Sequence, residues 1–244
     1  MNNNNFANYQ NIFNINKRLK SPRKRYPGHY PDKYSIKKDE NNTLILHSCK
    51  LLKSYYNDGI KALILDGKEM RTTKSLKYLG DRLKELIIVE YNKETYSIIN
   101  NEIKSDKYIR CYNHHINDYI NNYNTSKINL VYFDLMENFF SSQNSLGSEF
   151  PIKIFLSKSE VNELIFASTF CLRNAENMNY QLQVDKILDS LDDIFNKNKF
   201  EKTQLIPKNN MRYKGQRGAN KSLMFVLYYL KKHKDNSKNE NIIY

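Results

Sequence analysis

Ala62-Leu-Ile-Leu-Asp66-Gly67, followed about one helix later by Glu85-Leu-Ile-Ile-Val-Glu90-Tyr91, decides the fold of this chain. Each segment is a continuous apolar run that ends in a carboxylate. Runs that are apolar at every position predict strands of a sheet covered by helices on both faces. Acidic residues at the ends of the first two strands are typical of α/β sheets that bind nucleosides. The pair therefore indicates a class of function, though not a substrate.

Further apolar runs continue the alternation of strands and helices along the chain. The strand candidates are Lys61–Asp66, Glu85–Glu90, Tyr108–Cys111, Asn129–Asp134, Asn162–Cys171, Thr203–Ile206 and Ser222–Lys231. The helix candidates are a segment from Thr43, as its N-cap, to Asp58-Gly59, then Thr72–Arg82, Lys93–Lys104, His114–Tyr123, Phe150–Ser157 and Tyr180–Asn196. Five βα repeats predict an α/β fold with a doubly wound, mostly parallel sheet.

The end of the pattern departs from a plain Rossmann order, because the last two strand candidates are joined without a helix. The segment between them, Lys208–Lys221, contains Gly215 and Gly218 and is compatible with a long hairpin or a loop. A helix followed by a terminal β-hairpin resembles the order of class I S-adenosylmethionine-dependent methyltransferases. This resemblance implies a seven-stranded sheet with helices on both faces and a C-terminal antiparallel hairpin.

Three segments extend the resemblance to a divergent, Rossmann-like group of these proteins found in algae, protists and large DNA viruses. Leu63-Ile-Leu-Asp66-Gly67 with Thr72-Thr73 resembles its first strand and the helix that follows. Val131-Tyr-Phe-Asp134 resembles its fourth strand, and Phe166-Ala-Ser-Thr-Phe-Cys-Leu-Arg173 resembles its fifth. The similarity spans about residues 60 to 230 and implies a transferase that uses S-adenosylmethionine as its cofactor.

The fold and the resemblance together imply which residues contact this cofactor at the carboxyl ends of the strands. Asp66 and Gly67 are expected next to the methionine part, and Thr72 and Thr73 at the start of the next helix, as caps of its free N–H groups. Glu90 is expected to accept hydrogen bonds from the ribose hydroxyls. The adenine is expected near the three residues Tyr91, Asn113 and His114.

Each assignment has a purely structural alternative. Asp66-Gly67 also fits a simple turn, Glu90 a solvated strand end, and Asn113 and His114 ordinary loop positions. The glycine-rich loop of ordinary methyltransferases is missing, since Gly67 is followed by Lys68-Glu69-Met70. A catalytically inactive protein of this fold, acting as a basic nucleic-acid-binding or assembly factor, is therefore the alternative to an enzyme.

The acceptor side carries fewer signals. Asp134-Leu-Met-Glu137 stands where enzymes that methylate amino groups of nucleic acids have a D-P-P-Y-like tetrapeptide, and it lacks both the prolines and the aromatic residue. Asp134 remains a candidate general base or cofactor contact. The adjacent pair His114-His115 does not suit a metal site, because neighbouring side chains point apart and no third ligand is evident.

Composition adds an expectation about partners. The 244 residues carry a formal net charge of +13, and nine Lys or Arg lie between Lys17 and Lys38 against one acid, Asp32. Such an excess favours an anionic partner such as nucleic acid. The candidate contacts are Arg23, Lys24 and Arg25 in this segment and Arg212, Lys214 and Arg217 before the last strand. A nuclear-import signal and a solvated tail are alternatives for the first cluster.

The domain prediction follows from the change in pattern at Thr43. Residues 1–42 are read as a basic, mostly disordered leader, 43–234 as the methyltransferase-like domain and 235–244 as a polar tail. No apolar run reaches the length of a membrane span. These features predict an intracellular protein of the cytoplasm or nucleus, where the cell can also be the host of a virus. They predict no membrane or metal partner. They do not predict an oligomeric state.

Overall fold

The computed structural model describes residues 33–135, 139–140, 147–172, 180–214 and 222–233. The strands are β1 (Ile60–Ile64), β2 (Leu83–Val89), β3 (Ile109–Tyr112), β4 (Leu130–Asp134), β5 (Glu163–Cys171), β6 (Phe200–Gln204), β7 (Arg212–Lys214) and β8 (Ser222–Lys232). The helices are α2 (Lys33–Ser48), α3 (Arg71–Leu76), α4 (Lys93–Glu102), α5 (Ile116–Asn122), α6 (Glu149–Lys158) and α7 (Tyr180–Lys197). Short 3-10 turns follow α2 and α3 and precede β7.

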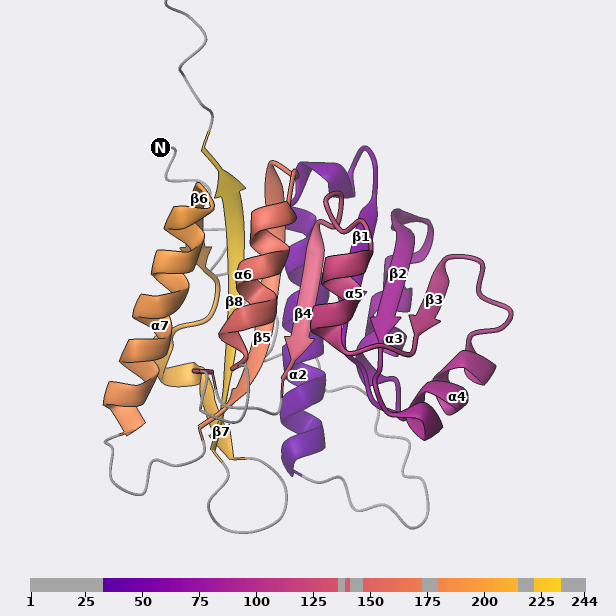
Figure 1. Cartoon of the computed structure of the whole chain (residues 1–244), viewed down its shortest axis with the longest axis horizontal. Helices are drawn as coiled ribbons and strands as arrows, with labels where there is room; N and C mark the ends of the chain where they lie inside the picture. Colours follow the sequence, from indigo (N-terminus) through magenta and orange to yellow (C-terminus); the bar gives the residue numbers. More distant parts are fainter. Residues whose placement is uncertain (1–32, 136–138, 141–146, 173–179, 215–221, 234–244) are drawn as a thin grey trace, which may run out of the picture.

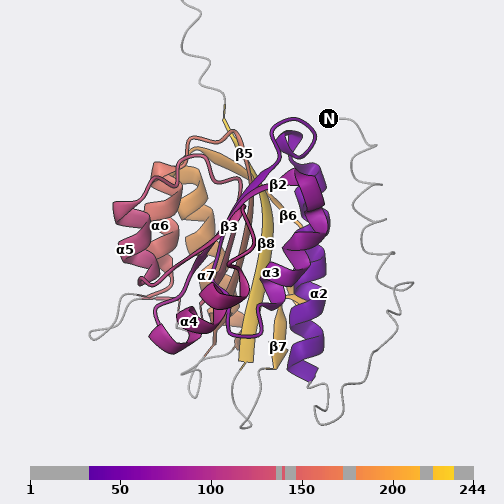
Figure 2. The same cartoon turned by 90° about the vertical axis from the view of Figure 1, so that its right-hand side faces the viewer.

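The strands form one mixed sheet in the order β3-β2-β1-β4-β5-β8-β6. The first five strands along the chain are parallel, while β8 inserts antiparallel between β5 and β6. Helices α5, α6 and α7 cover one face and α2 and α3 the other, as Figure 2 shows. The predicted doubly wound, mostly parallel fold is confirmed, with seven strands in this order and an eighth, β7, that pairs with β8.

The C-terminal region contains one strand more than the sequence predicts. Strand β6 pairs with the end of β8, from Tyr228 to Lys232, and the short β7 pairs with its beginning, from Ser222 to Met224. Two strands therefore lie one after the other along the same side of β8. The segment between the last two predicted strands is accordingly more than a loop, because its Arg212–Lys214 part joins the sheet.

Interlocking aromatic rings fix α7 against the antiparallel end of the sheet. The Phe195 ring lies 5.5 Å from Phe166 on β5 and 5.2 Å from Tyr228 on β8, both edge-on. All three side chains are almost completely buried. Edge-to-face pairs at these distances add stability to a core beyond that gained from burying their surface area. The position of β8 is therefore set by packing as well as by its two neighbouring strands.

The described fold begins at Lys33, before the predicted domain start at Thr43. Helix α2 begins at Lys33, so residues 33–42 belong to the fold rather than to a disordered leader. Thr43 does not cap this helix; it lies in its interior, where its hydroxyl donates to the carbonyl of Asp39. The remaining part of the predicted leader, residues 1–32, and the whole predicted tail, residues 235–244, lie outside the described residues. Within the described ranges, no helix is both long and apolar enough to cross a membrane.

Candidate functional site

The carboxyl ends of β1 and β4 meet at the point where the strand order reverses, since β1 lies between β2 and β4. Asp66 follows β1 by two residues, and Asp134 is the last residue of β4. The two carboxylates interact electrostatically. Open α/β sheets bind their ligands at such a switch point. In Figure 1 the N-terminal end of α2 extends past this edge of the sheet, where the arrowhead of β4 ends.

Asp66 holds the start of α3 in place. Its Oδ2 atom accepts hydrogen bonds from the backbone N–H of Thr73, at 2.7 Å, and from the Thr73 hydroxyl, at 2.8 Å. Its Oδ1 atom accepts from the N–H of Gly67. Burial raises the pKa of the Asp66 carboxyl, against the lowering effect of the Thr73 backbone hydrogen bond and of the nearby Lys38.

Thr72 and Thr73 do not cap α3, contrary to the prediction, because they lie inside its first turn. The N-cap position is Met70, which has a left-handed backbone with φ of 51° and makes no side-chain cap. The Asp66 carboxylate satisfies the N–H of Thr73 instead. The Thr72 hydroxyl donates to Oδ1 of Asn42 on α2 at 3.1 Å. Both threonine hydroxyls thus join α3 to its neighbours.

Gly67 begins a tight turn in which its carbonyl accepts the N–H of Met70 at 2.9 Å. Its backbone needs no glycine, since φ lies outside the positive region and an added Cβ would come within 4 Å only of Glu69 Oε2, at 3.7 Å. The described protein atoms therefore do not require a glycine here. The predicted close approach of a cofactor to Gly67 remains a prediction.

Asp134 is paired with a residue that the sequence analysis missed. The Lys38 ammonium, on α2, lies 2.6 Å from Asp134 Oδ2, and the two side chains are only 14% and 11% exposed. The next residue, Asp39, pairs with Arg71 at the start of α3 at 3.1 Å in a more exposed contact. Helix α2 thus supplies the cation of one ion pair and the anion of the other, and both pairs hold it over the carboxyl ends of β1 and β4.

Glu90 and Asn113 organise the neighbouring strand ends. The Glu90 Oε1 atom accepts the N–H of Asn92 at 2.7 Å, and burial raises the pKa of the Glu90 carboxyl. The Asn113 side-chain amide donates to the carbonyls of Glu90 and Tyr91 at 2.9 and 3.0 Å. The structure thus brings three of the predicted residues together. Tyr91 itself is 74% exposed, and its ring lies 6.5 Å from that of His115, which was not predicted as a contact.

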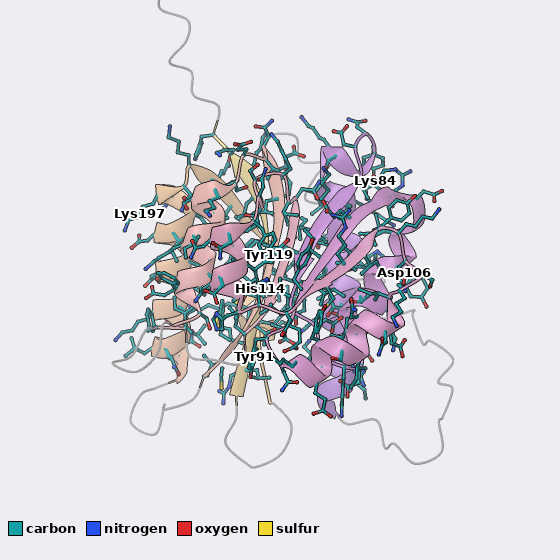
Figure 3. All side chains as sticks on the ribbon, turned by 45° about the vertical axis from the view of Figure 1, so that its right-hand side comes forward. Lys84, Tyr91, Asp106, His114, Tyr119 and Lys197 are labelled. Atoms are coloured by element: carbon teal, nitrogen blue, oxygen red, sulfur yellow. The ribbon has the colours of Figure 1, made fainter. Side chains whose placement is uncertain are left out.

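His114 turns toward α5 instead. Its Nε2 atom lies 3.2 Å from the hydroxyl of Tyr123, whose ring stacks on Tyr119 with centroids 4.5 Å apart. Figure 3 shows Tyr119, His114 and Tyr91 following one another toward the lower edge of the molecule. His114 therefore belongs to a tyrosine cluster on this face, and its predicted contact with adenine stays a prediction.

The structure describes only part of the predicted set of basic nucleic-acid contacts. Arg212 is exposed on β7 and Lys214 ends that strand, whereas Arg23, Lys24, Arg25 and Arg217 lie outside the described residues. In the part of the chain that the structure describes, no group of three or more His, Cys, Asp or Glu side chains is placed to hold a metal ion.

Comparison with known proteins supports the fold assignment. No family model matches the sequence, and neither does any curated protein. A proposed O-methyltransferase from Klebsiella pneumoniae is similar in structure, with a TM-score of 0.51 at 9% identity, over 91% of this chain and 89% of the other. A proposed caffeoyl-CoA O-methyltransferase from Staphylococcus aureus has a TM-score of 0.50 at 10% identity, over 92% and 99%. The finer resemblance to the algal and viral group stays a prediction. The chain has the Rossmann-like fold of class I S-adenosylmethionine-dependent methyltransferases.

Proposed function

We propose that this protein is an S-adenosylmethionine-dependent methyltransferase whose acceptor is a nucleic acid. The observation that carries the proposal is the set of three acids at the carboxyl ends of β1, β2 and β4, namely Asp66, Glu90 and Asp134, in a sheet with the methyltransferase strand order. The ends of these three strands flank the switch point, where such folds bind nucleosides.

The residues present fit the charge of the cofactor. S-adenosylmethionine carries a sulfonium, an ammonium and a carboxylate, so its net charge is positive. Asp66, Asp134 and Lys38 together give a net negative charge when both carboxyls are ionised. In this proposal Glu90 accepts hydrogen bonds from the ribose hydroxyls, and Tyr91 and His115 lie beside the adenine. When bound, the cofactor supplies an electrophilic methyl group.

The chain's own residues then position the acceptor. Asp134 is the proposed base, and its ion pair with Lys38 fixes the carboxylate at the end of β4. Methyl transfer depends largely on holding the two reactants in line, and a positioned carboxylate can also take up a proton from the acceptor. No covalent enzyme intermediate is needed.

Calorimetry with S-adenosylmethionine and S-adenosylhomocysteine tests the proposal. We expect wild-type protein to bind both, and Glu90→Gln to weaken binding by about 1.5 to 3 kcal/mol, the usual loss for hydrogen bonds to a charged group. Gln keeps an oxygen for the N–H of Asn92 but removes the charge. Glu94→Gln, an exposed change in the first turn of α4, is the matched control and should leave affinity unchanged.

Two results would count against these assignments. Absence of binding at high micromolar concentration, with the wild-type protein demonstrably folded, would refute the enzyme and favour the inactive, nucleic-acid-binding alternative. Equal affinities of wild type and Glu90→Gln would refute the placement of the ribose while leaving the cofactor itself in place.

The nucleic-acid part of the proposal rests on charge. Residues 1–32 contain six Lys or Arg and a single acid. Deleting them stops short of α2, which begins at Lys33. We expect the truncated protein to bind single-stranded RNA at least about tenfold more weakly at low salt, with a shallower salt dependence, because fewer counterions are released. Its affinity for S-adenosylhomocysteine should not change. Unchanged RNA affinity, measured by fluorescence anisotropy, would exclude the leader as a binding segment.

A further inference from the structure

Three exposed tyrosines gather at the edge of the sheet opposite the candidate site. Tyr56 shortly precedes β1, Tyr78 lies in the 3-10 turn Lys77–Arg82 before β2, and Tyr108 directly precedes β3. Because β1, β2 and β3 are parallel, their amino ends meet at one edge. The three side chains are 64%, 85% and 61% exposed. The described part of the chain thus leaves most of each ring uncovered, and a ring of this kind is available to stack against a ligand.

The Tyr56 ring is held in one orientation by its neighbours. It packs edge-on against Tyr55, with ring centroids 5.0 Å apart. The Arg82 guanidinium lies 4.5 Å from the centroid of the Tyr55 ring and 5.6 Å from that of Tyr56. Its Nη1 atom also donates to the Tyr55 carbonyl at 2.7 Å. A ring held in this way loses little conformational freedom when a ligand stacks on it.

Side-chain contacts join the segments that carry the three tyrosines. The Lys77 ammonium pairs with Asp106 at 2.8 Å, which links the turn before β2 to the segment before β3. Arg82, at the end of the same turn, contacts Tyr56 before β1. Figure 3 shows Lys84 and Asp106 on the same side of the molecule. The three rings therefore belong to one continuous surface, which we call the amino-edge surface.

The amino-edge surface has an excess of positive charge. Its three segments contain eight Lys or Arg and four acids, counted over residues 53–61, 77–85 and 104–110. Two of the four acids, Glu85 and Asp106, are already occupied in ion pairs. Lys84 lies against the turn before β1, since a Cβ added to Gly59 would come 2.6 Å from the Cγ atom of Lys84. An anionic chain is therefore attracted to the edge where the rings are exposed.

We infer that the amino-edge surface binds a single-stranded nucleic acid, with unpaired bases stacked on the tyrosine rings and phosphates beside the basic side chains. Proteins bind single strands by this combination of aromatic rings, which accept any base, and a positively charged path for the backbone. An acidic protein segment would use the positive charge but not the three uncovered rings. The surface lies about 20 Å from the candidate site, because the seven-residue strand β2 separates the two edges. The inference does not depend on methyl transfer and applies equally to an inactive protein of this fold.

Fluorescence anisotropy of a labelled single-stranded oligouridylate, with the full-length protein, tests the role of the rings. We expect Tyr78→Ala combined with Tyr108→Ala to weaken binding at least about tenfold at low salt, because two stacking contacts are lost. Tyr78→Phe combined with Tyr108→Phe keeps both rings and should bind within about twofold of wild type. Both positions are exposed, so the melting temperature of the variants should equal that of wild type.

The same probe annealed to oligoadenylate gives a second reading. Its bases are paired and stacked on one another, so they offer no free faces to the tyrosines. We expect the double alanine variant to bind this duplex within about twofold of wild type. An equal loss for the single strand and the duplex would overturn the stacking of bases on these rings.

Two matched controls lie on α7, at the far end of the sheet in Figure 1. Leu182 is an exposed apolar residue of this helix, and Leu182→Ala should leave the affinity for the probe unchanged. Lys84→Gln should lower the slope of log affinity against log salt by about 0.7, the value for one phosphate contact of a single strand. Lys197→Gln should leave the slope unchanged, because Lys197 lies on the opposite side of the molecule from Lys84 in Figure 3.

Failure of this inference is distinguishable from failure of the proposed function. If the double alanine variant binds the single strand as tightly as wild type does, the amino-edge surface is overturned and cofactor binding is unaffected. Competition by polyglutamate as strong as that by unlabelled oligouridylate would also overturn it, in favour of an acidic protein segment. If the wild type does not bind the single strand, this inference fails together with the nucleic-acid part of the proposed function. Affinity for S-adenosylhomocysteine, measured separately by calorimetry, should be the same in wild type and in all these variants.

Discussion

Lys38→Met is expected to lower the free energy of unfolding by about 3 kcal/mol, because it leaves the Asp134 carboxylate largely buried without its counter-ion. We place this loss at the lower end of the range for buried pairs, because the Lys38 and Asp134 side chains are still 14% and 11% exposed. The loss is amplified by Asp66, a second carboxylate that already repels Asp134. Chemical denaturation at neutral pH, followed by circular dichroism, measures it.

Lys37→Met provides the matched control on the preceding residue. Lys37 pairs with Glu40 at 3.2 Å in an exposed contact, and such surface pairs contribute about 0 to 1 kcal/mol. The double variant Lys38→Met with Asp134→Asn should recover much of the stability lost in the single variant, because it also removes the unpaired negative charge of Asp134. A Lys38→Met protein no less stable than Lys37→Met would show that the pair does not hold α2 in place.

The loss of stability caused by Lys38→Met is also expected to depend on pH. Burial raises the pKa of Asp66 above its ordinary value of 3.8, and Lys38 acts to lower it. Removing Lys38 raises this pKa further, so the folded state binds the proton more tightly than the unfolded state does. Stability of the variant relative to wild type therefore rises as the pH falls toward 3.8. If the difference in free energy of unfolding between wild type and Lys38→Met does not change with pH, an effect of the Lys38 charge on the pKa of Asp66 is excluded.

The sheet could be predicted from the sequence because its strands are buried on both faces. Strand β5 is buried at every position after Glu163, and β4 at every position before Asp134. Such runs are visible without knowledge of their partners. Strand β6 shows the limit of the method, since it begins at Phe200 but its other four residues are exposed. Edge strands of this kind carry little apolar signal, and the predicted boundary was three residues late.

The site was harder to predict, because its missing members come from a helix without an apolar period. The sequence of α2 is largely polar as far as Asn42, yet Asn41 and Asn42 are buried. Lys38 stood in a basic run that has the composition of a disordered leader. Its ion pair with Asp134, 96 residues later, places it at the candidate site. Contacts of this range depend on the tertiary structure, and local patterns do not reveal them.

Asp66→Ala is expected to destabilise the protein by about 2 to 4 kcal/mol, through the loss of a cap and the exposure of unmet hydrogen-bond donors in the core. The carboxylate accepts both the N–H and the hydroxyl of Thr73, a residue that is completely buried. Alanine leaves both donors without their acceptor at the start of α3. Thermal and chemical unfolding measure the change.

Asp66→Asn separates the structural role of this residue from its proposed role toward the cofactor. The amide oxygen can still accept from Thr73, so the expected loss of stability is below about 1 kcal/mol. The negative charge, however, is gone. S-adenosylmethionine is positively charged at its sulfonium and S-adenosylhomocysteine is not, so Asp66→Asn should weaken binding of the former more than that of the latter. Unchanged affinity for both ligands, in a variant as stable as expected, would mean that Asp66 serves only to hold α3 against β1.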